Sequence, residues 1–191
     1  MPAITFKPKQ VVKRLLSPLS PRALDVMIKR YGLGESVDRM TLEGIGKTYG
    51  ITRERVRQIE NFALSAIKKA DAFKKENAVF EELNKLVVSM GGVVCEEDFL
   101  MHISKDASTQ NHLFFLLVLG DQFKREKEDE NFRHRWIVDD KVSMKVHDAI
   151  RELYKTLSHE DLIPESEIVA SFLNHLKDVS EEYKNEEITK R

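Results

Sequence analysis

The chain has 191 residues, of which 41% are apolar and 33% charged, a composition typical of a globular protein with one or two domains. Its single cysteine, Cys95, excludes an internal disulfide and a cysteine-based zinc site, and no apolar run is long enough to span a membrane. The net charge of −1 is the sum of two parts of the chain with opposite charge. Residues 1–78 contain 16 Lys and Arg against 8 Asp and Glu, a balance of +8, which leaves −9 for the remainder. This asymmetry predicts two modules, of which the basic one favours a polyanion as partner.

Residues 1–11 are predicted to form a flexible arm, because the segment is polar and contains two prolines. A helix with clear ends follows. Ser20 is a suitable N-cap, Pro21 takes the first helical position, and Gly32 supplies the stop. The apolar face predicted for this helix consists of Leu24, Met27, Ile28 and Tyr31.

Residues 41–70 have the pattern of a helix-turn-helix. Thr41 caps a short helix, Gly50 ends it, and Thr52 caps a longer helix that extends to about Ala70. The inner stripe predicted for the longer helix consists of Val56, Ile59, Ala63 and Ile67.

A charged linker is expected at residues 71–78, after which the pattern changes. Residues 79–140 predict three helices, a short strand near GGVV, and two strands around an acidic turn. Helices followed by a terminal hairpin are the layout of a winged helix. Trp136 is expected in the core of this hairpin, and Cys95, beside two valines, is expected to be buried.

Residues 142–191 weakly repeat the start of this module, since VFEELNKLVVSM aligns with VHDAIRELYKTL. The repeat has no counterpart of the hairpin, so it is either shortened by nature or cut at Arg191, and the sequence leaves both open. Residues 142–191 are expected either to pack on the first winged helix or to be poorly ordered beyond about His175, because the last residues are highly charged.

The candidate site is the arginine-rich start of the second helix of the helix-turn-helix. Arg53, Glu54, Arg57 and Gln58 share the face opposite the inner stripe. Arginine can bind guanine, glutamine can bind adenine, and glutamate can accept a hydrogen bond from cytosine. The alternative is a solvated helix with ion pairs between neighbouring turns. The predicted DNA-binding residues are Thr52, Arg53, Glu54, Arg55, Arg57 and Gln58.

LSPRALDVMIKRYGL followed by TLEGIGKTYGITRERVRQIENFALSAIKK resembles region 4 of sigma-70 family factors over about residues 12–70. In that family the module binds the minus-thirty-five promoter element and the flap of RNA polymerase. The resemblance implies base contacts by Arg53, Glu54, Arg57 and Gln58, with Arg55 nearer the phosphate backbone. It favours a regulator that uses a promoter-reading domain over a complete initiation factor.

Residues 79–140 resemble the winged-helix type called HARE-HTH, which also occurs in the delta subunit of some bacterial RNA polymerases. The third helix of this module has no Lys or Arg, so protein contact or a structural role is favoured over DNA contact.

The expected fold is therefore mainly α, with a helix-turn-helix domain, a winged helix and a partial second one. The expected function is sequence-specific binding of promoter-like double-stranded DNA in bacterial transcription, with RNA polymerase as partner and a cytoplasmic, nucleoid-associated location. No enzyme motif, cofactor, metal, membrane or small-molecule substrate is expected. The alternative is a protein-interaction module that occupies the polymerase flap without reading DNA.

Overall fold

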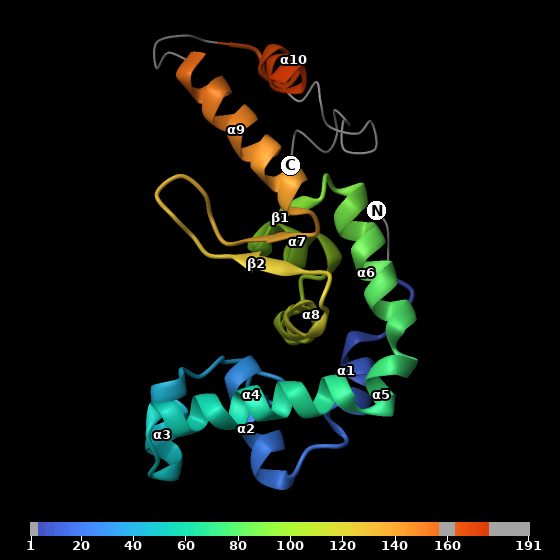
Figure 1. Cartoon of the computed structure of the whole chain (residues 1–191), viewed down its shortest axis with the longest axis vertical. Helices are drawn as coiled ribbons and strands as arrows, with labels where there is room; N and C mark the ends of the chain where they lie inside the picture. The colour runs from blue at the N-terminus through green and yellow to red at the C-terminus, as the bar shows by residue number, and fades with distance from the viewer. Residues whose placement is uncertain (1–3, 157–162, 176–191) are drawn as a thin grey trace. The chain divides into compact units, whose positions relative to one another are not determined.

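The computed structural model describes residues 4–156 and 163–175 (Figure 1). The chain divides into two compact units, which are described separately. Unit 1 consists of residues 1–82 and 100–121, and unit 2 of residues 83–99 and 122–191. Within the described ranges, none of the helices has the length and apolarity needed to cross a lipid bilayer.

The described residues of unit 1 form helices and the loops that connect them, with no strand. Its helices are α1 (Pro8–Leu16), α2 (Pro21–Tyr31), α3 (Leu42–Tyr49), α4 (Arg53–Lys69), α5 (Asp71–Lys75) and α8 (Ala107–Leu119), together with the first part of α6 (Asn77–Ser89) and the second half of α7 (Glu96–Ile103).

The predicted helix ends of the helix-turn-helix region are confirmed. The hydroxyl oxygens of Ser20, Thr41 and Thr52 each accept a hydrogen bond from the backbone N–H three residues later. Gly32 and Gly50 end α2 and α3 with φ of 62° and 63°, a conformation that glycine adopts without strain.

Helical structure begins earlier, and is more continuous, than the sequence pattern indicated. α1 begins at Pro8, inside the segment for which a flexible arm was expected, and its Val11 and Val12 are buried. Residues 71–78, expected to be a linker, contain α5 and the start of α6. The carboxylate of Glu76 accepts a hydrogen bond of 2.5 Å from Nε of Arg14, which ties this segment to α1.

A buried acidic side chain joins α2 to α4. Glu60 of α4 is only 8% exposed, and its Oε1 accepts hydrogen bonds from the Tyr31 hydroxyl at 2.9 Å and from Nε of Arg30 at 3.1 Å. Burial, followed by the negative charge of Glu60, raises the pKa of Tyr31, so this hydroxyl remains a donor. The end of α2 is therefore held against the middle of α4.

Helix α8 completes unit 1, although the sequence pattern assigned it to the module 79–140. The ring of Phe115 lies 4.9 Å from that of Tyr31, and the amide of Asn111 donates to the carbonyls of Gly32, at 3.0 Å, and Val37, at 2.8 Å. Nε of Arg39 donates to Oδ1 of Asn111 at 2.7 Å. The expected module 79–140 is thus divided between the two units.

Unit 2 contains a three-stranded antiparallel sheet with the order β1-β3-β2, formed by β1 (Val93–Cys95), β2 (Lys124–Glu126) and β3 (Arg135–Ile137). The predicted hairpin and the strand at GGVV are confirmed. Trp136 is paired with Val94 and Arg125 and is 2% exposed, so its core position is also confirmed. The expectation for Cys95 was wrong, since this side chain is half-buried at the sheet edge.

The last described elements of unit 2 are α9 (Asp140–Thr156) and α10 (Glu165–His175). They contact one another through Ala149, with Val146 and Phe172 packed around it. The expectation of poor order beyond His175 lies outside the described residues.

The Asn111 contacts yield a test of the role of α8. Asn111→Ala should lower the free energy of unfolding by about 2 kcal/mol, because the buried Gly32 carbonyl and the part-buried Val37 carbonyl both lose their donor. Urea unfolding followed by circular dichroism measures this change. Asn131→Ala, at an exposed position between β2 and β3, is the matched control and should change stability little. Equal effects of the two substitutions would contradict the assignment of α8 to unit 1.

His112 of α8 yields a pH prediction. Nδ1 of His112 lies 2.6 Å from the Ser108 carbonyl, and burial lowers the pKa of the ring below its ordinary value. The unfolded chain then takes up this proton more readily than the folded one. The stability that the neutral His112 ring contributes is therefore fully present above its pKa in the unfolded chain, about 6.5. This contribution is lost as the pH falls through the lower pKa of His112 in the folded protein.

The free energy of unfolding of the wild type should accordingly fall more steeply than that of His112→Gln as the pH is lowered from about 8 to 5. Other histidines contribute to both proteins alike, so the difference between the two curves isolates His112. Parallel curves would refute this prediction.

Candidate nucleic-acid interface

Helices α3 and α4 form the helix-turn-helix, and they are in close contact along the turn that joins them (Figure 1). Val26, Ile45 and Val56, each fully buried, form the core beneath them. Gly46 lies so close to the turn that a Cβ there would come within 2.7 Å of the Ile51 carbonyl oxygen. The missing side chain thus allows α3 to approach the start of α4.

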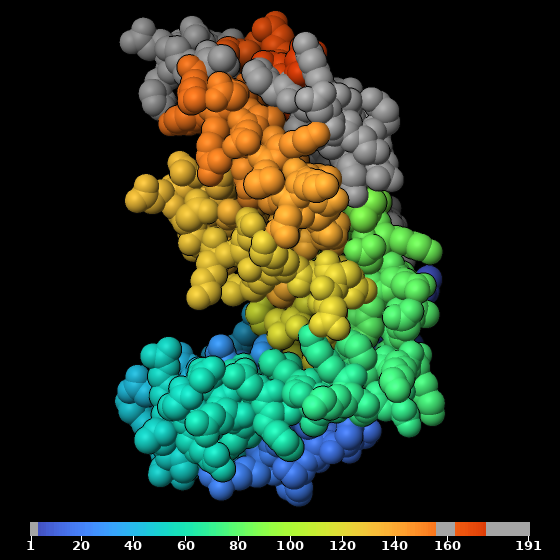
Figure 2. All heavy atoms as spheres, viewed as in Figure 1, coloured from blue at the N-terminus to red at the C-terminus, as the bar shows by residue number. Residues whose placement is uncertain are grey.

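All six predicted site residues lie at the solvent-exposed start of α4. Thr52 is the N-cap, and its Oγ1 accepts from the Arg55 backbone N–H at 3.2 Å. The inner face of the helix holds Val56, Ala63 and Ile67, all fully buried, whereas Ile59 is only half-buried. Figure 2 shows the residues of α3 and α4, in cyan and turquoise, as one continuous surface.

Glu54 and Arg57 form a bidentate ion pair on this surface. Nε and Nη2 of Arg57 donate to the two carboxylate oxygens of Glu54 at 2.8 and 2.7 Å. This pairing lowers the pKa of Glu54 and raises that of Arg57, so both side chains are charged at neutral pH. The fork of Arg57 is thereby turned toward Glu54 at the helix surface.

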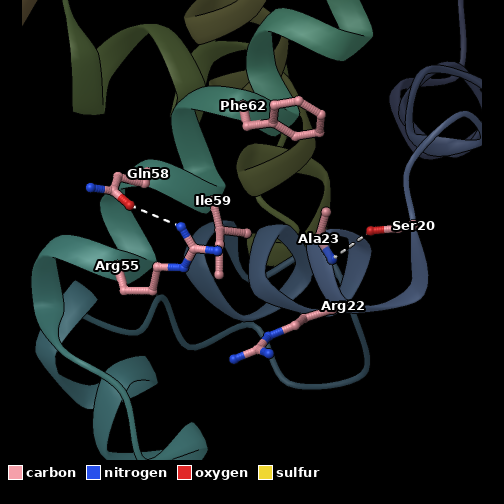
Figure 3. Close-up of a pocket in the computed structure, with 7 residues that line it drawn as sticks. All are labelled: Ser20, Arg22, Ala23, Arg55, Gln58, Ile59 and Phe62. Carbon is pink, nitrogen blue, oxygen red and sulfur yellow. Dashed lines mark hydrogen bonds between the residues drawn. The ribbon is translucent and has the colours of Figure 1, made fainter.

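Arg55 and Gln58 form a second pair, on the side of α4 that faces α2. Nη1 of Arg55 donates to Oε1 of Gln58 at 3.0 Å. Both side chains line a hollow of about 480 Å³ (Figure 3). The structure therefore separates the predicted residues into two pairs, Glu54 with Arg57 and Arg55 with Gln58.

The hollow also contains residues that the sequence pattern did not assign to the site. α4 contributes Ile59 and Phe62 to it, and the α2 side contributes Ser20, Arg22 and Ala23 (Figure 3). Phe62 could have been found from the sequence, because it is an apolar residue outside the inner stripe and one turn beyond Gln58. Arg22 carries no such signal, since its approach to α4 depends on how α2 packs.

Electrostatically, the interface is a cationic surface that carries hydrogen-bonding side chains. Arg53, Arg55 and Arg57 are exposed within the first two turns of α4, whose N-terminus also has free backbone N–H groups. The guanidinium of Arg22 lies 5.6 Å from the centre of the Tyr49 ring, which positions a further cation beside α3. Such a surface is suited to phosphates and to the polar edges of bases.

Comparison with known families identifies the family to which this helix-turn-helix is similar. Residues 15–69 match the family described as "Sigma-70, region 4". Residues 15–69 are a sigma-70 region 4 domain. They contain all six site residues, the three N-caps and the buried Glu60.

Similar proteins match about a third of the chain. The chain is 39% identical over 66 residues to the RNA polymerase principal sigma factor HrdD of Streptomyces coelicolor, which covers 35% of this chain and 20% of that protein. It is 48% identical over 61 residues to the RNA polymerase sigma factor SigA1 of Synechococcus elongatus, which covers 31% of this chain and 15% of that protein. The chain thus spans a fifth or less of the length of these relatives, and no solved structure matches it.

The N-cap of α4 yields a testable prediction. Thr52→Ala should lower the free energy of unfolding by about 1 kcal/mol, because the Arg55 N–H loses its acceptor. Thr52→Ser keeps the hydroxyl and should retain most of this stability. Chemical denaturation of both variants measures the effect. An equal loss in the two variants would show that the cap hydrogen bond is not the cause.

Proposed function

We propose that the region 4 domain binds double-stranded DNA in a sequence-specific manner and acts with RNA polymerase in transcription initiation or its regulation. The observation that carries this proposal is the set of exposed arginine, glutamate and glutamine side chains on the first two turns of α4. In a helix-turn-helix, these turns of the second helix enter the major groove.

Each side chain has a role that follows from its chemistry. The planar fork of Arg57 suits the O6 and N7 atoms of a guanine, and Glu54 can accept from the amino group of a cytosine. The amide of Gln58 suits adenine. Arg53 and Arg55 flank these groups, and Arg55, turned toward α2, is suited to the phosphate backbone.

The N-terminus of α4 supplies a further contact that does not depend on sequence. Its first N–H groups and the positive end of the helix dipole favour a phosphate beside Thr52. Arg22 lies on the same hollow as Arg55, so it is positioned to extend this row of phosphate contacts. Such contacts fix the register of the helix on the duplex, and the base contacts specify the sequence.

The comparisons support RNA polymerase as the partner and a promoter-like element as the target. The similar proteins are RNA polymerase sigma factors by name, and the shared part is region 4. Because these relatives are matched over a fifth or less of their length, the proposal covers the activity of this domain and not that of a whole sigma factor.

We further propose a winged-helix arrangement for residues 79–140, based on the order of their elements along the chain. Their order is α6, β1, α7, α8, β2 and β3, and the strands form one antiparallel sheet. This agrees with the HARE-HTH type, in which we also place residues 142–191 as a partial second repeat. We propose a structural or protein-contact role for this part, since α8 carries no Lys or Arg and is largely buried.

Selection of bound sites from random duplex DNA tests the proposed function. A promoter-like consensus and an affinity that falls with salt are expected. Binding without sequence preference would contradict base reading. The absence of duplex binding would favour a protein-interaction module that occupies the polymerase without reading DNA.

The base contacts yield a further prediction. Arg57→Ala and Gln58→Ala should each weaken binding to the selected site by about 1–3 kcal/mol and relax the preference at one position. Lys69→Ala, at the exposed end of the same helix, is the control and should leave the preference unchanged. Titration of specific and random duplexes separates the two effects. Equal losses on both duplexes for Gln58→Ala would show that it does not read a base.

A further inference from the structure

The loop between β2 and β3 in unit 2, residues 127–134, is joined to α9 through an aromatic contact (Figure 1). The ring of Phe132, in this loop, lies 4.4 Å from the ring of His147, in α9. Within the loop, the backbone N–H groups of Asn131 and Phe132 both donate to Oδ1 of Asp129 at 2.9 Å. These bonds shape the loop itself, whereas Phe132 carries it to the helix. The attachment of the loop to α9 therefore depends on the state of the His147 ring.

The surroundings of His147 suit a neutral ring. The residue is 8% exposed, and its Nδ1 lies 3.4 Å from the Ser143 hydroxyl oxygen. Its Nε2 is buried and has no hydrogen-bond partner in the part of the chain that the structure describes. A neutral ring has one N–H, for which the Ser143 hydroxyl can serve as acceptor, whereas a protonated ring has two N–H donors and a positive charge. Protonation would therefore leave a charged N–H buried without an acceptor, which costs free energy.

Two arginines lie beside the same aromatic contact. The guanidinium carbons of Arg135, in β3, and Arg151, in α9, are 4.9 and 5.4 Å from the centre of the Phe132 ring. A protonated His147 would be the third cation at this ring. Its attraction to the face of the ring would be opposed by its repulsion from the two guanidinium groups.

Two carboxylates also face this site, and Arg135 is paired with both. Nη2 of Arg135 lies 2.9 Å from the carboxylate of Glu126, in β2, and 3.1 Å from that of Asp129, in the loop. Burial, followed by the charge of Arg135, lowers the pKa of His147, and Arg151 adds to this effect. Glu126 and Asp129 oppose the shift without cancelling it, so the pKa lies below its ordinary value.

The direction of this shift determines how the contact depends on pH. Because the pKa of His147 is lower when the loop is packed than when the ring is in solvent, the proton binds preferentially to the released state. The stability of the contact is therefore fully present above a pH of about 6.5, the ordinary pKa of histidine. It is lost as the pH falls through the lower pKa of the packed state.

We propose that Phe132 and His147 form a pH-sensitive latch, in which the neutral His147 ring holds the loop 127–134 against α9 and protonation of this ring releases the loop. Release uncovers the Phe132 ring and changes how the loop presents its exposed Lys127 and Arg133. The surface of unit 2 then differs between neutral and mildly acidic conditions. The latch lies within unit 2 and does not depend on the DNA binding proposed for the region 4 domain.

NMR spectroscopy of the full chain, with labelled phenylalanine and histidine, tests this proposal between a pH of about 8 and 5. As the pH is lowered, the ring signals of Phe132 should move toward the positions of an exposed phenylalanine. The midpoint of this change should coincide with the titration of His147 and lie below a pH of about 6.5. Phe132 signals that stay in place while His147 titrates, or that move at a different pH, would overturn the proposal.

Three variants identify the group responsible. His147→Phe keeps an aromatic ring at the contact but takes up no proton, so the Phe132 signals should stay in place over the same pH range. Arg151→Gln removes one of the facing cations and should raise the midpoint by roughly 0.3 pH units. His134→Gln changes the histidine of the loop itself and is the control, which should leave the midpoint unchanged.

A transition that persists in His147→Phe, or that His134→Gln abolishes, would show that His147 is not the switch. A lower midpoint in Arg151→Gln would contradict the role given to the arginines. If His147→Phe does not fold, the coincidence of the two midpoints in the wild type still decides between a latch and independent titration.

Discussion

The buried carboxylate of Glu60 is the constraint on which the geometry of the region 4 domain depends. A carboxylate removed from water is costly unless donors replace the lost solvent. Both donors of Glu60, the Tyr31 hydroxyl and Nε of Arg30, come from adjacent residues at the end of α2. Glu60 is therefore satisfied only when this end of α2 lies against the middle of α4. Apolar packing tolerates small shifts, but a hydrogen-bonded buried charge does not, so the two helices are fixed in one register.

The orientation of the recognition face follows from the same constraint. Successive residues of a helix are rotated by about 100°, so turning Glu60 toward α2 turns Glu54 and Gln58 away from the core. The Tyr31 ring also continues into the contact with Phe115 of α8. One cluster of side chains thus joins α2, α4 and α8 and determines which residues of α4 remain in solvent. The exposed face that is proposed to read DNA is therefore determined by the hydrogen bonds of the opposite face.

The sequence predicted those parts of the fold whose cause is local. The caps at Ser20, Thr41 and Thr52 depend on residues at most three positions away, and all three are as expected. The buried face of α2 was predicted less well, because α4 and α8 both pack on it and bury Ala23 and Val26 in place of Leu24 and Ile28. The position of α8 could not be predicted at all. Its second half, residues 113–119, is apolar on every side, so periodicity does not identify a neighbour, and Asn111 bonds to carbonyls 79 and 74 residues away.

The candidate site was predictable as a set, because its residues lie on the first turns of one helix, but the pairing of its side chains was not. Helical spacing places Arg57 within reach of several side chains, of which Glu54 is one. Only the structure shows that Arg57 pairs with Glu54 and that Arg55 pairs with Gln58. Both pairs are exposed, so water competes for their hydrogen bonds, and salt also screens the ion pair of Glu54 with Arg57; such contacts contribute little to stability. Their contacts can therefore be exchanged for base edges at small cost, whereas a buried pair such as Glu60 with Arg30 cannot. The domain thus keeps its rigid hydrogen bonds on the inner face of α4 and its exchangeable ones on the outer face, as the proposed reading of a duplex requires.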